Sequence, residues 1–325
     1  MGVFADLLDT KKTLLVDGAM GTELFARGLT AGDPPEMWNI DMPDKVTSVH
    51  TGYIDAGSDI ILTNSFGGTS FRLKLHNLAE RAVELNAAAA RVARAAADKA
   101  DRTVVVAGSM GPSGELMAPL GEMTPGTART AFAEQAKGLA EGGADVLWIE
   151  TMSSLDEVAA AVEGARIVTD LPIAATMSFD TAGRTMMGVT GAEAATRMID
   201  LGLVAIGANC GNNIAETESA VAEIRSGAGD VPVIVKANAG VPEFKGESLT
   251  YTGTPEVMGA HVKRMMDLGV TIIGGCCGTS TEHLAYMRGV VDGDIAAPDV
   301  DAPGPKVVAA GAGRDRTRRR SRRRG

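Results

Sequence analysis

Long apolar runs are absent from this sequence. No stretch of the 325 residues reaches the roughly 18 uninterrupted apolar residues that a membrane-spanning helix needs, so the sequence excludes an integral membrane protein. The first twelve residues carry four charged side chains and lack the apolar segment that is typical of a secretion signal. We therefore expect a cytoplasmic protein in a reducing compartment.

Cysteine is scarce as well, with three residues at Cys210, Cys276 and Cys277. An odd number with two adjacent members is a poor disulfide framework, because neighbouring residues do not easily pair with each other. Cys210 could pair with only one of the other two. The three thiols are therefore either incidental or gathered around a common site.

The formal net charge of −10 conceals an uneven distribution of charge. The last twelve residues, Arg314–Gly325, contain eight arginines and one acid, which leaves 23 basic and 40 acidic residues in the body, a net charge of −17. Such a body should repel nucleic acid, so we expect no nucleic-acid partner apart from weak attraction to the tail. We interpret residues 296–325 as a Pro/Gly/Ala-rich linker and a disordered arginine-rich tail. The sequence leaves the oligomeric state open.

Short apolar runs alternate with amphipathic stretches along the body. The runs are apolar nearly throughout, as in strands covered on both faces, and lie at 13–16, 59–62, 103–107, 145–149, 172–176, 203–206, 231–235 and 270–273. The stretches with helical spacing lie at 44–56, 78–97, 127–142, 155–168, 192–201, 215–225, 255–268 and 281–291. This alternation predicts an α/β fold, a (βα)₈ TIM barrel that occupies residues 1–295 as a single domain. A doubly wound sheet is the alternative, but residues 17–22 read DGAMGT and not GxGxxG.

All three cysteines follow predicted strands, Cys210 after the sixth and Cys276 and Cys277 after the eighth. The carboxyl ends of barrel strands form the active-site face, so the three thiols should converge at its mouth. Three thiolates with an open fourth position describe a catalytic zinc site, whereas the alternative is three small buried hydrophobic residues. Zinc with three thiolates carries a charge of −1 and suits a further thiolate, which implies alkylation of a substrate thiol.

Six segments carry a resemblance to a known family. They are DGAMGTEL at 17–24, TNSFG at 63–67, GPSGE at 111–115, GANCG at 207–211, KANAG at 236–240 and GGCCGT at 274–279. From about residue 14 to residue 291 the sequence resembles the homocysteine S-methyltransferase family, which includes stand-alone bacterial betaine–homocysteine methyltransferases and the homocysteine module of methionine synthase. The resemblance implies a zinc-dependent barrel that methylates the small-molecule substrate homocysteine to methionine, with Cys210, Cys276 and Cys277 as metal ligands.

The resemblance also implies roles for residues around the cysteines. Glu150 matches the acidic residue that holds the amino group of homocysteine, and a buried salt-bridge carboxylate is the alternative. Asp17 and Gly18 match the part of the amino-acid pocket on the first strand, although Asp17 could instead cap the following turn. Ser109 and Asn209 are expected to line the pocket.

The methyl donor is the least determined part of the prediction. The chain has no recognisable folate or cobalamin module, so we expect a small onium donor, most simply betaine. S-methylmethionine is one alternative, and a homocysteine-activating module that works with a separate corrinoid or folate protein is another. Quaternary ammonium recognition favours an aromatic cage. With only twelve aromatic residues in the chain, Trp38, Phe66 and Tyr251 are the candidates, and core packing is the alternative for each.

Overall fold

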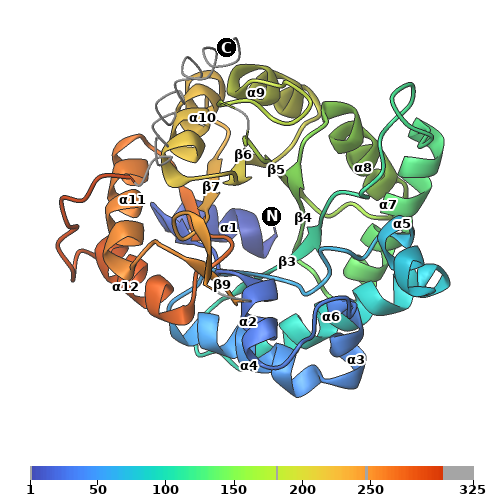
Figure 1. The fold of residues 1–325 in the computed structure, drawn as a ribbon, viewed down its shortest axis with the longest axis horizontal. Helices are drawn as coiled ribbons and strands as arrows, with labels where there is room; N and C mark the ends of the chain where they lie inside the picture. Colours follow the sequence, from blue (N-terminus) through green and yellow to red (C-terminus); the bar gives the residue numbers. More distant parts are fainter. Residues whose placement is uncertain (1, 181, 246–247, 303–325) are drawn as a thin grey trace, which may run out of the picture.

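The computed structural model describes residues 2–180, 182–245 and 248–302, and its central feature is a closed ring of parallel strands (Figure 1). The eight strands are β1 (Leu14–Leu15), β2 (Ile60–Leu62), β3 (Val105–Met110), β4 (Val146–Met152), β5 (Ile173–Met177), β6 (Ala205–Cys210), β7 (Val233–Ala237) and β10 (Ile272–Gly275). They pair in the order β1-β10-β7-β6-β5-β4-β3-β2. A parallel bridge between Val16 and Ile60 closes the ring between β1 and β2. The predicted (βα)₈ barrel is confirmed.

A ring of helices surrounds the barrel, and each of the eight predicted helical stretches overlaps one of them. They are α4 (Pro43–Asp55), α6 (Ala82–Ala97), α7 (Pro125–Glu141), α8 (Leu155–Val168), α9 (Gly191–Asp200), α10 (Ile214–Gly227), α11 (Pro255–Asp267) and α12 (Thr281–Asp292). Several begin at a residue whose side chain accepts a hydrogen bond from the first turn, as Ser154, Thr190 and Asn213 do. In the described part of the chain, no helix is both long and apolar enough to cross a membrane.

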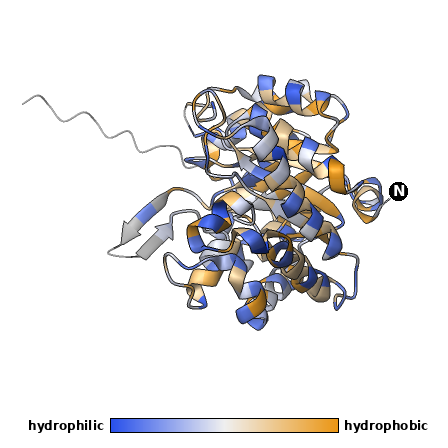
Figure 2. Cartoon of the chain, turned by 90° about the vertical axis from the view of Figure 1, so that its right-hand side faces the viewer, coloured by the Kyte–Doolittle hydropathy of each residue, from blue (hydrophilic) through white to orange (hydrophobic). Residues whose placement is uncertain are grey.

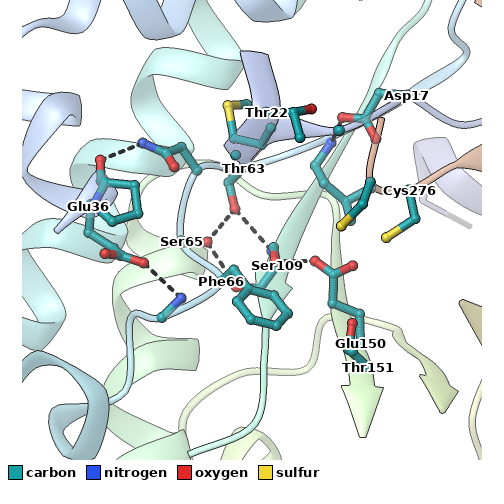
Figure 3. Close-up of a pocket in the computed structure, with 18 of the residues that line it drawn as sticks. Asp17, Thr22, Glu36, Thr63, Ser65, Phe66, Ser109, Glu150, Thr151 and Cys276 are labelled. Carbon is teal, nitrogen blue, oxygen red and sulfur yellow. Dashed lines mark hydrogen bonds between the residues drawn. The ribbon is translucent and has the colours of Figure 1, made fainter. Parts of the chain in front are cut away.

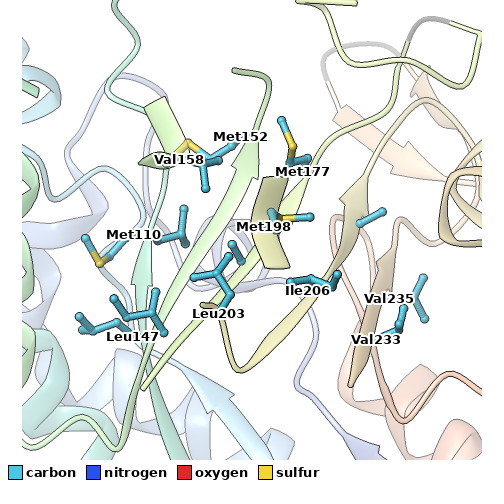
Figure 4. Packing of buried hydrophobic residues seen from close by; sticks show 14 of the residues in the cluster. Met110, Leu147, Met152, Val158, Met177, Met198, Leu203, Ile206, Val233 and Val235 are labelled. Atoms are coloured by element: carbon cyan, nitrogen blue, oxygen red, sulfur yellow. The ribbon is translucent and has the colours of Figure 1, made fainter. Parts of the chain in front are cut away.

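The strands are apolar throughout because both of their faces are buried. Leu14 and Val16 point into the barrel interior with Trp148, whereas Leu15 lies in the larger layer between strands and helices. Figure 4 shows this outer layer, where Ile206 and Val233 from the strands lie among side chains that include Met198 of α9. Because both faces of each strand make nonpolar contacts, the strand sequences are continuous apolar runs and do not alternate between apolar and polar residues.

Several elements were not predicted. Helix α1 (Val3–Thr10) buries Phe4 and Leu7 against the interior cluster and covers one end of the barrel. The hairpin of β8 (Pro242–Lys245) and β9 (Ser248–Tyr251) projects at the opposite end (Figure 2). Short helices α2 (Met20–Ala26), α3 (Trp38–Asp41) and α5 (Ser70–Leu73) lie in the loops after β1 and β2, with the 3-10 turns η1 (Pro35–Met37), η2 (Lys74–His76) and η3 (Ala79–Arg81). Most of the predicted linker and tail, residues 303–325, lies outside the described residues.

One buried histidine gives the fold a pH dependence that can be measured. His50 of α4 is fully buried, and neither of its ring nitrogens has a hydrogen-bond partner. Burial lowers the pKa of His50 to about 4. Since an unfolded histidine titrates at about pH 6.5, the unfolded state binds more protons between that pH and the folded pKa, and the folded state loses stability as pH falls through this window.

We therefore predict that His50→Leu flattens the pH dependence of stability. Between pH 7 and pH 4, the free energy of unfolding should fall by roughly 3 kcal/mol less in the variant than in the parent protein. Urea denaturation at a series of pH values measures this difference. An equal fall in the free energy of unfolding in the two proteins would show that His50 does not cause the pH dependence.

Candidate active site at the carboxyl end of the barrel

The three cysteines converge at the mouth of the barrel. Cys210 ends β6, and Cys276 and Cys277 directly follow β10. The sulfur atoms of Cys210 and Cys276 are 3.0 Å apart, and the three sulfurs all lie within 4.8 Å of one another. The turn after them needs a glycine, because Gly278 has a φ of +77° and a Cβ there would lie 2.2 Å from the ring of Tyr251. The sequence prediction that these thiols share one site agrees with this geometry.

Asn238 joins the two loops that carry the cysteines. Its Nδ2 donates a hydrogen bond of 2.8 Å to the carbonyl oxygen of Gly211, directly after Cys210. Its Oδ1 accepts a hydrogen bond of 3.0 Å from the backbone N–H of Cys277. One neutral amide therefore fixes both loops, and it does so without placing a charge beside the sulfurs.

Asn209 stabilises an unusual backbone next to the cysteines. Cys210 and Thr151 both have a positive φ, +60° and +62°, which costs a non-glycine residue about 1 kcal/mol or more. The side chain of Asn209 accepts a hydrogen bond from the Thr151 N–H (2.8 Å) and donates one to Thr151 Oγ1 (2.7 Å). Thr176 donates a further hydrogen bond of 2.6 Å to Asn209 Oδ1. Asn209 thus holds the irregular end of β4, where Glu150 lies, against the cysteine of β6.

Charged side chains lie beside the cysteines in the barrel interior. Lys236 of β7 and Asp17 form an ion pair of 2.9 Å, and the side chain of each is only 3% exposed. Asp17 also accepts a hydrogen bond of 2.7 Å from the Leu62 N–H. Burial alone would lower the pKa of Lys236, but the carboxylates of Asp17 and Glu150 outweigh it and hold the pKa above its usual value. Lys236 therefore remains a cation at the centre of the site.

Glu150 faces the cavity in a less compensated environment. Its carboxylate accepts a short hydrogen bond from Ser109, and among the described residues no cation lies within ion-pair distance of it. Burial raises the pKa of Glu150 to about 7, although the charge of Lys236 opposes the shift. A buried carboxylate that lacks a contacting cation favours a ligand that brings one.

A single cavity connects these groups (Figure 3). Its lining includes the predicted residues Asp17, Gly18, Phe66, Ser109, Glu150, Cys210, Cys276 and Cys277. Asn209 lies behind this wall, 1% exposed, and supports it.

Two of the three aromatic candidates lie outside the cavity lining. Trp38 lies under the ammonium of Lys45, with Nζ 4.6 Å from the ring centroid. The ring of Tyr251 lies against Gly278, where a Cβ would lie 2.2 Å from it.

The sequence reasoning missed the charged residues at the far end of the cavity, which are Glu36, Arg72 and His76. Arg72 and His76 lie in the segment that follows β2, so their position after a strand end could have indicated them. Glu36 lies in an aperiodic loop with two prolines, where no pattern distinguishes it.

The comparisons with known proteins agree with the geometry. Residues 14–291 match the family model for homocysteine S-methyltransferase. The chain belongs to the homocysteine S-methyltransferase family. Methionine synthases from Mycobacterium tuberculosis (strain H37Rv) and Mycobacterium leprae are 33% and 31% identical to it over 303 residues, which cover 88% of this chain but 25% of each relative. The chain therefore spans about a quarter of the length of these relatives.

The fold is also that of solved structures. The metallated form of the homocysteine methyltransferase MmuM from Escherichia coli matches with a TM-score of 0.75 at 24% identity, over 88% of this chain and 99% of that one. The oxidised form of the same enzyme gives a TM-score of 0.74 at 24% identity, over 89% of this chain and 99% of that one. This likeness supports the barrel architecture.

The cysteine cluster has the composition and spacing for a zinc ion. Zn²⁺ bound to thiolates at about 2.3 Å in tetrahedral geometry separates the sulfurs by about 3.8 Å. The observed 3.0 Å between Cys210 and Cys276 and the upper limit of 4.8 Å for the trio bracket this value. The neighbouring sulfurs of Cys210 and Cys276 lower the pKa of the Cys277 thiol despite its burial, and the same coupling raises the pKa of the Cys210 thiol. The trio can hold zinc after small side-chain movements.

We predict about one zinc ion per chain, bound through all three sulfurs. Each of Cys210→Ala, Cys276→Ala and Cys277→Ala should lose the metal, which elemental analysis after dialysis against zinc-free buffer measures. Ser109→Ala is the matched control, since its hydroxyl contacts Glu150 and no sulfur. Full zinc content in any one of the cysteine variants would show that the trio does not bind the ion.

The buried ion pair predicts an asymmetric response to substitution. Lys236→Met leaves Asp17 buried without its partner and should lower the free energy of unfolding by about 3–5 kcal/mol. The double variant Asp17→Asn/Lys236→Met removes both charges and should recover most of that loss. Urea denaturation of both variants measures the effect. A double variant as unstable as the single one would show that Lys236 contributes by packing and not by charge.

Proposed function

We propose that this protein transfers a methyl group from a small onium donor to the thiol of homocysteine, which yields methionine, with zinc held by Cys210, Cys276 and Cys277. The observation that carries this proposal is the cavity itself. The sulfurs of the three cysteines open into the same space as the carboxylates of Asp17 and Glu150. A substrate with a thiol at one end and an amino acid at the other fits that pairing of groups.

The residues around the cysteines would bind the amino-acid part of homocysteine. Glu150, buried and without a cation in contact, is assigned to the substrate ammonium, and Ser109 orients its carboxylate. The backbone of Gly18 is assigned to the substrate carboxylate. A side chain cannot replace the glycine there, because a Cβ would lie 2.5 Å from the carbonyl oxygen of Thr279. The ammonium of Lys236 compensates the negative charge of the Asp17 carboxylate within this pocket.

Bound zinc would supply a Lewis acid that lowers the pKa of the substrate thiol, so that the thiol loses its proton to water and remains nucleophilic at neutral pH. The thiolate sulfur then attacks the donor methyl carbon. A sulfur–carbon bond forms while the carbon–nitrogen bond of betaine, or the carbon–sulfur bond of S-methylmethionine, breaks. The electron pair leaves with the donor, which becomes a neutral amine or thioether. Since opposite charges vanish in this step, a cavity that excludes water favours it.

The length of the relatives supports a second candidate function. The chain spans about a quarter of the two methionine synthases, so the proposed alternative is a homocysteine-activating unit that receives its methyl group from a separate corrinoid protein. The cysteine cluster and the homocysteine contacts have the same roles in both proposals. Only the source of the methyl group differs.

We predict that the zinc-loaded chain forms deuterium-labelled methionine from homocysteine and a trideuteromethyl onium donor. Betaine and S-methylmethionine are tested separately, with mass spectrometry of methionine as the measurement. Cys276→Ala should give no product above the uncatalysed background. Transfer from S-methylmethionine but not betaine would overturn betaine as the donor. Transfer only from an added methylcorrinoid would favour the second function, and no transfer from any donor would contradict both.

A further inference from the structure

The end of β3 is held on one side by side chains and not by a neighbouring strand. The pairing of β2 with β3 stops at Ala107, so the end of β3 extends beyond its neighbour. The N–H of Ser109 donates a hydrogen bond of 2.9 Å to Thr63 Oγ1, and its carbonyl oxygen accepts one of 2.8 Å from Ser65 Oγ. Figure 3 shows these contacts beside the hydrogen bond from Ser109 to Glu150. The position of Ser109 therefore depends on the loop that follows β2.

That loop is held in turn by two buried amides, Gln135 of α7 and Asn86 of α6, which we call the amide pair. Gln135 Nε2 donates a hydrogen bond of 2.8 Å to the carbonyl oxygen of Ser65 and one of 3.2 Å to Asn86 Oδ1. The same Nε2 lies 3.4 Å from the carbonyl oxygen of Ser109. Asn86 Nδ2 donates a hydrogen bond of 2.7 Å to the carbonyl oxygen of Gly68. The amide pair thus attaches the loop to the helices outside the barrel.

The loop backbone lies directly against the amide pair. A Cβ at Gly68 would lie 2.3 Å from Asn86 Oδ1 and 2.8 Å from Gln135 Nε2. Glycine permits this close approach, whereas any other residue would separate the loop from the two amides. The contact between loop and helices is therefore tight enough to fix the loop in one position.

Stability of the fold alone does not explain the amide of Gln135. The side chain is fully buried, and among the described residues its Oε1 has no hydrogen-bond partner. A buried polar atom without a partner lowers stability, and an apolar side chain of similar length, such as methionine, would avoid it. Methionine could not donate a hydrogen bond to the loop. The donor group Nε2 is therefore the feature that glutamine supplies at this position.

Glu150 lies at the other end of this chain of contacts. Its carboxylate accepts a hydrogen bond from Ser109 Oγ, and in the described part of the chain no cation lies within ion-pair distance of it. Because Ser109 is the side chain that orients this carboxylate, a shift of the Ser109 backbone changes where the carboxylate points. A charged hydrogen bond to a substrate ammonium depends on distance and angle. The position of Ser109 therefore controls how well Glu150 can meet such a group.

We propose that Gln135, together with Asn86, is a positioning residue for the binding of the homocysteine ammonium. It acts through Ser65 and Ser109 on the carboxylate of Glu150, although Gln135 does not itself line the cavity. This inference rests on the proposed function, which assigns Glu150 to that ammonium. It adds that two helices outside the barrel, α6 and α7, take part in recognition of the substrate amino group.

The test compares homocysteine with 4-mercaptobutanoate, which has the same thiol and carboxylate but lacks the amino group. Isothermal titration calorimetry on the zinc-loaded full chain measures the Kd of each thiol, so no methyl donor is needed. The parent protein should bind homocysteine roughly 10- to 100-fold more tightly, the range for a hydrogen bond to a charged group. Gln135→Met should weaken homocysteine binding by roughly tenfold and leave the Kd of 4-mercaptobutanoate unchanged.

A double-mutant cycle tests the route through Ser109. Ser109→Ala removes the hydroxyl that orients Glu150 and should weaken the binding of homocysteine alone. Adding Gln135→Met to this variant should cause a further loss of about twofold or less, because both changes act through the same contact. Additive losses would show that Gln135 does not act through Ser109. Phe132→Leu, a buried apolar change on the same helix, is the matched control and should alter neither Kd.

Stability and zinc content distinguish positioning from a loss of structure. Gln135→Met removes the unpartnered Oε1 but leaves Asn86 Oδ1 without its donor, so the urea midpoint and the zinc content should stay close to those of the parent protein. Should this variant fail to fold, Ser65→Ala takes its place, because it removes the hydroxyl that contacts the carbonyl of Ser109. The same selective loss of homocysteine affinity is expected from it.

The outcomes separate this inference from the function on which it rests. In a folded variant, equal weakening of both thiols, or unchanged binding of homocysteine, would overturn the role of Gln135 alone. A parent protein that binds the two thiols equally would overturn the assignment of Glu150 and this inference with it. A zinc-loaded parent protein that binds no homocysteine would overturn the proposed function itself.

Discussion

Asp17 forms the contacts on which the geometry of the barrel mouth depends. Its backbone N–H donates a hydrogen bond to Ile60 at the closure between β1 and β2, and its carbonyl oxygen accepts one from Gly275 at the end of β10. Its carboxylate binds the Leu62 N–H and the ammonium of Lys236. One buried acid therefore joins β1 to both of its neighbours in the ring and reaches β7. Together, these contacts offset the free-energy cost of removing the carboxylate of Asp17 from water.

The cysteine site depends in turn on two neutral amides. Asn209 supports the positive φ at Thr151 and adjoins the positive φ at Cys210, and Asn238 joins the loops of Cys210 and Cys277. These contacts hold the three sulfurs close together through protein groups alone. A preorganised ligand set needs less rearrangement when the metal binds, which is why such supporting contacts raise metal affinity. Under the proposed function, homocysteine would reach this ligand set from the cavity, which all three cysteines line.

The barrel could be predicted because its strands are apolar on both faces, which produces runs that are easy to recognise. The cysteine trio could be predicted because residues that follow parallel strands must meet at one end of the barrel. Helix α1 and the hairpin of β8 and β9 could not, since short segments depend on tertiary contacts more than on periodicity. Asn209 was expected to line the pocket but acts behind it, through hydrogen bonds to Thr151 that join residues 58 positions apart. Glu36 could not be predicted, because no sequence pattern distinguishes a loop residue that lines the cavity from one that does not.

The central claim is that three protein sulfurs hold zinc and that the substrate thiol supplies the fourth sulfur. X-ray absorption at the zinc edge, on the zinc-loaded full chain before and after addition of homocysteine, measures this directly. The account predicts that the number of sulfur neighbours rises from three to four, at about 2.3 Å from the ion. A shell that keeps three sulfurs at saturating homocysteine would contradict it.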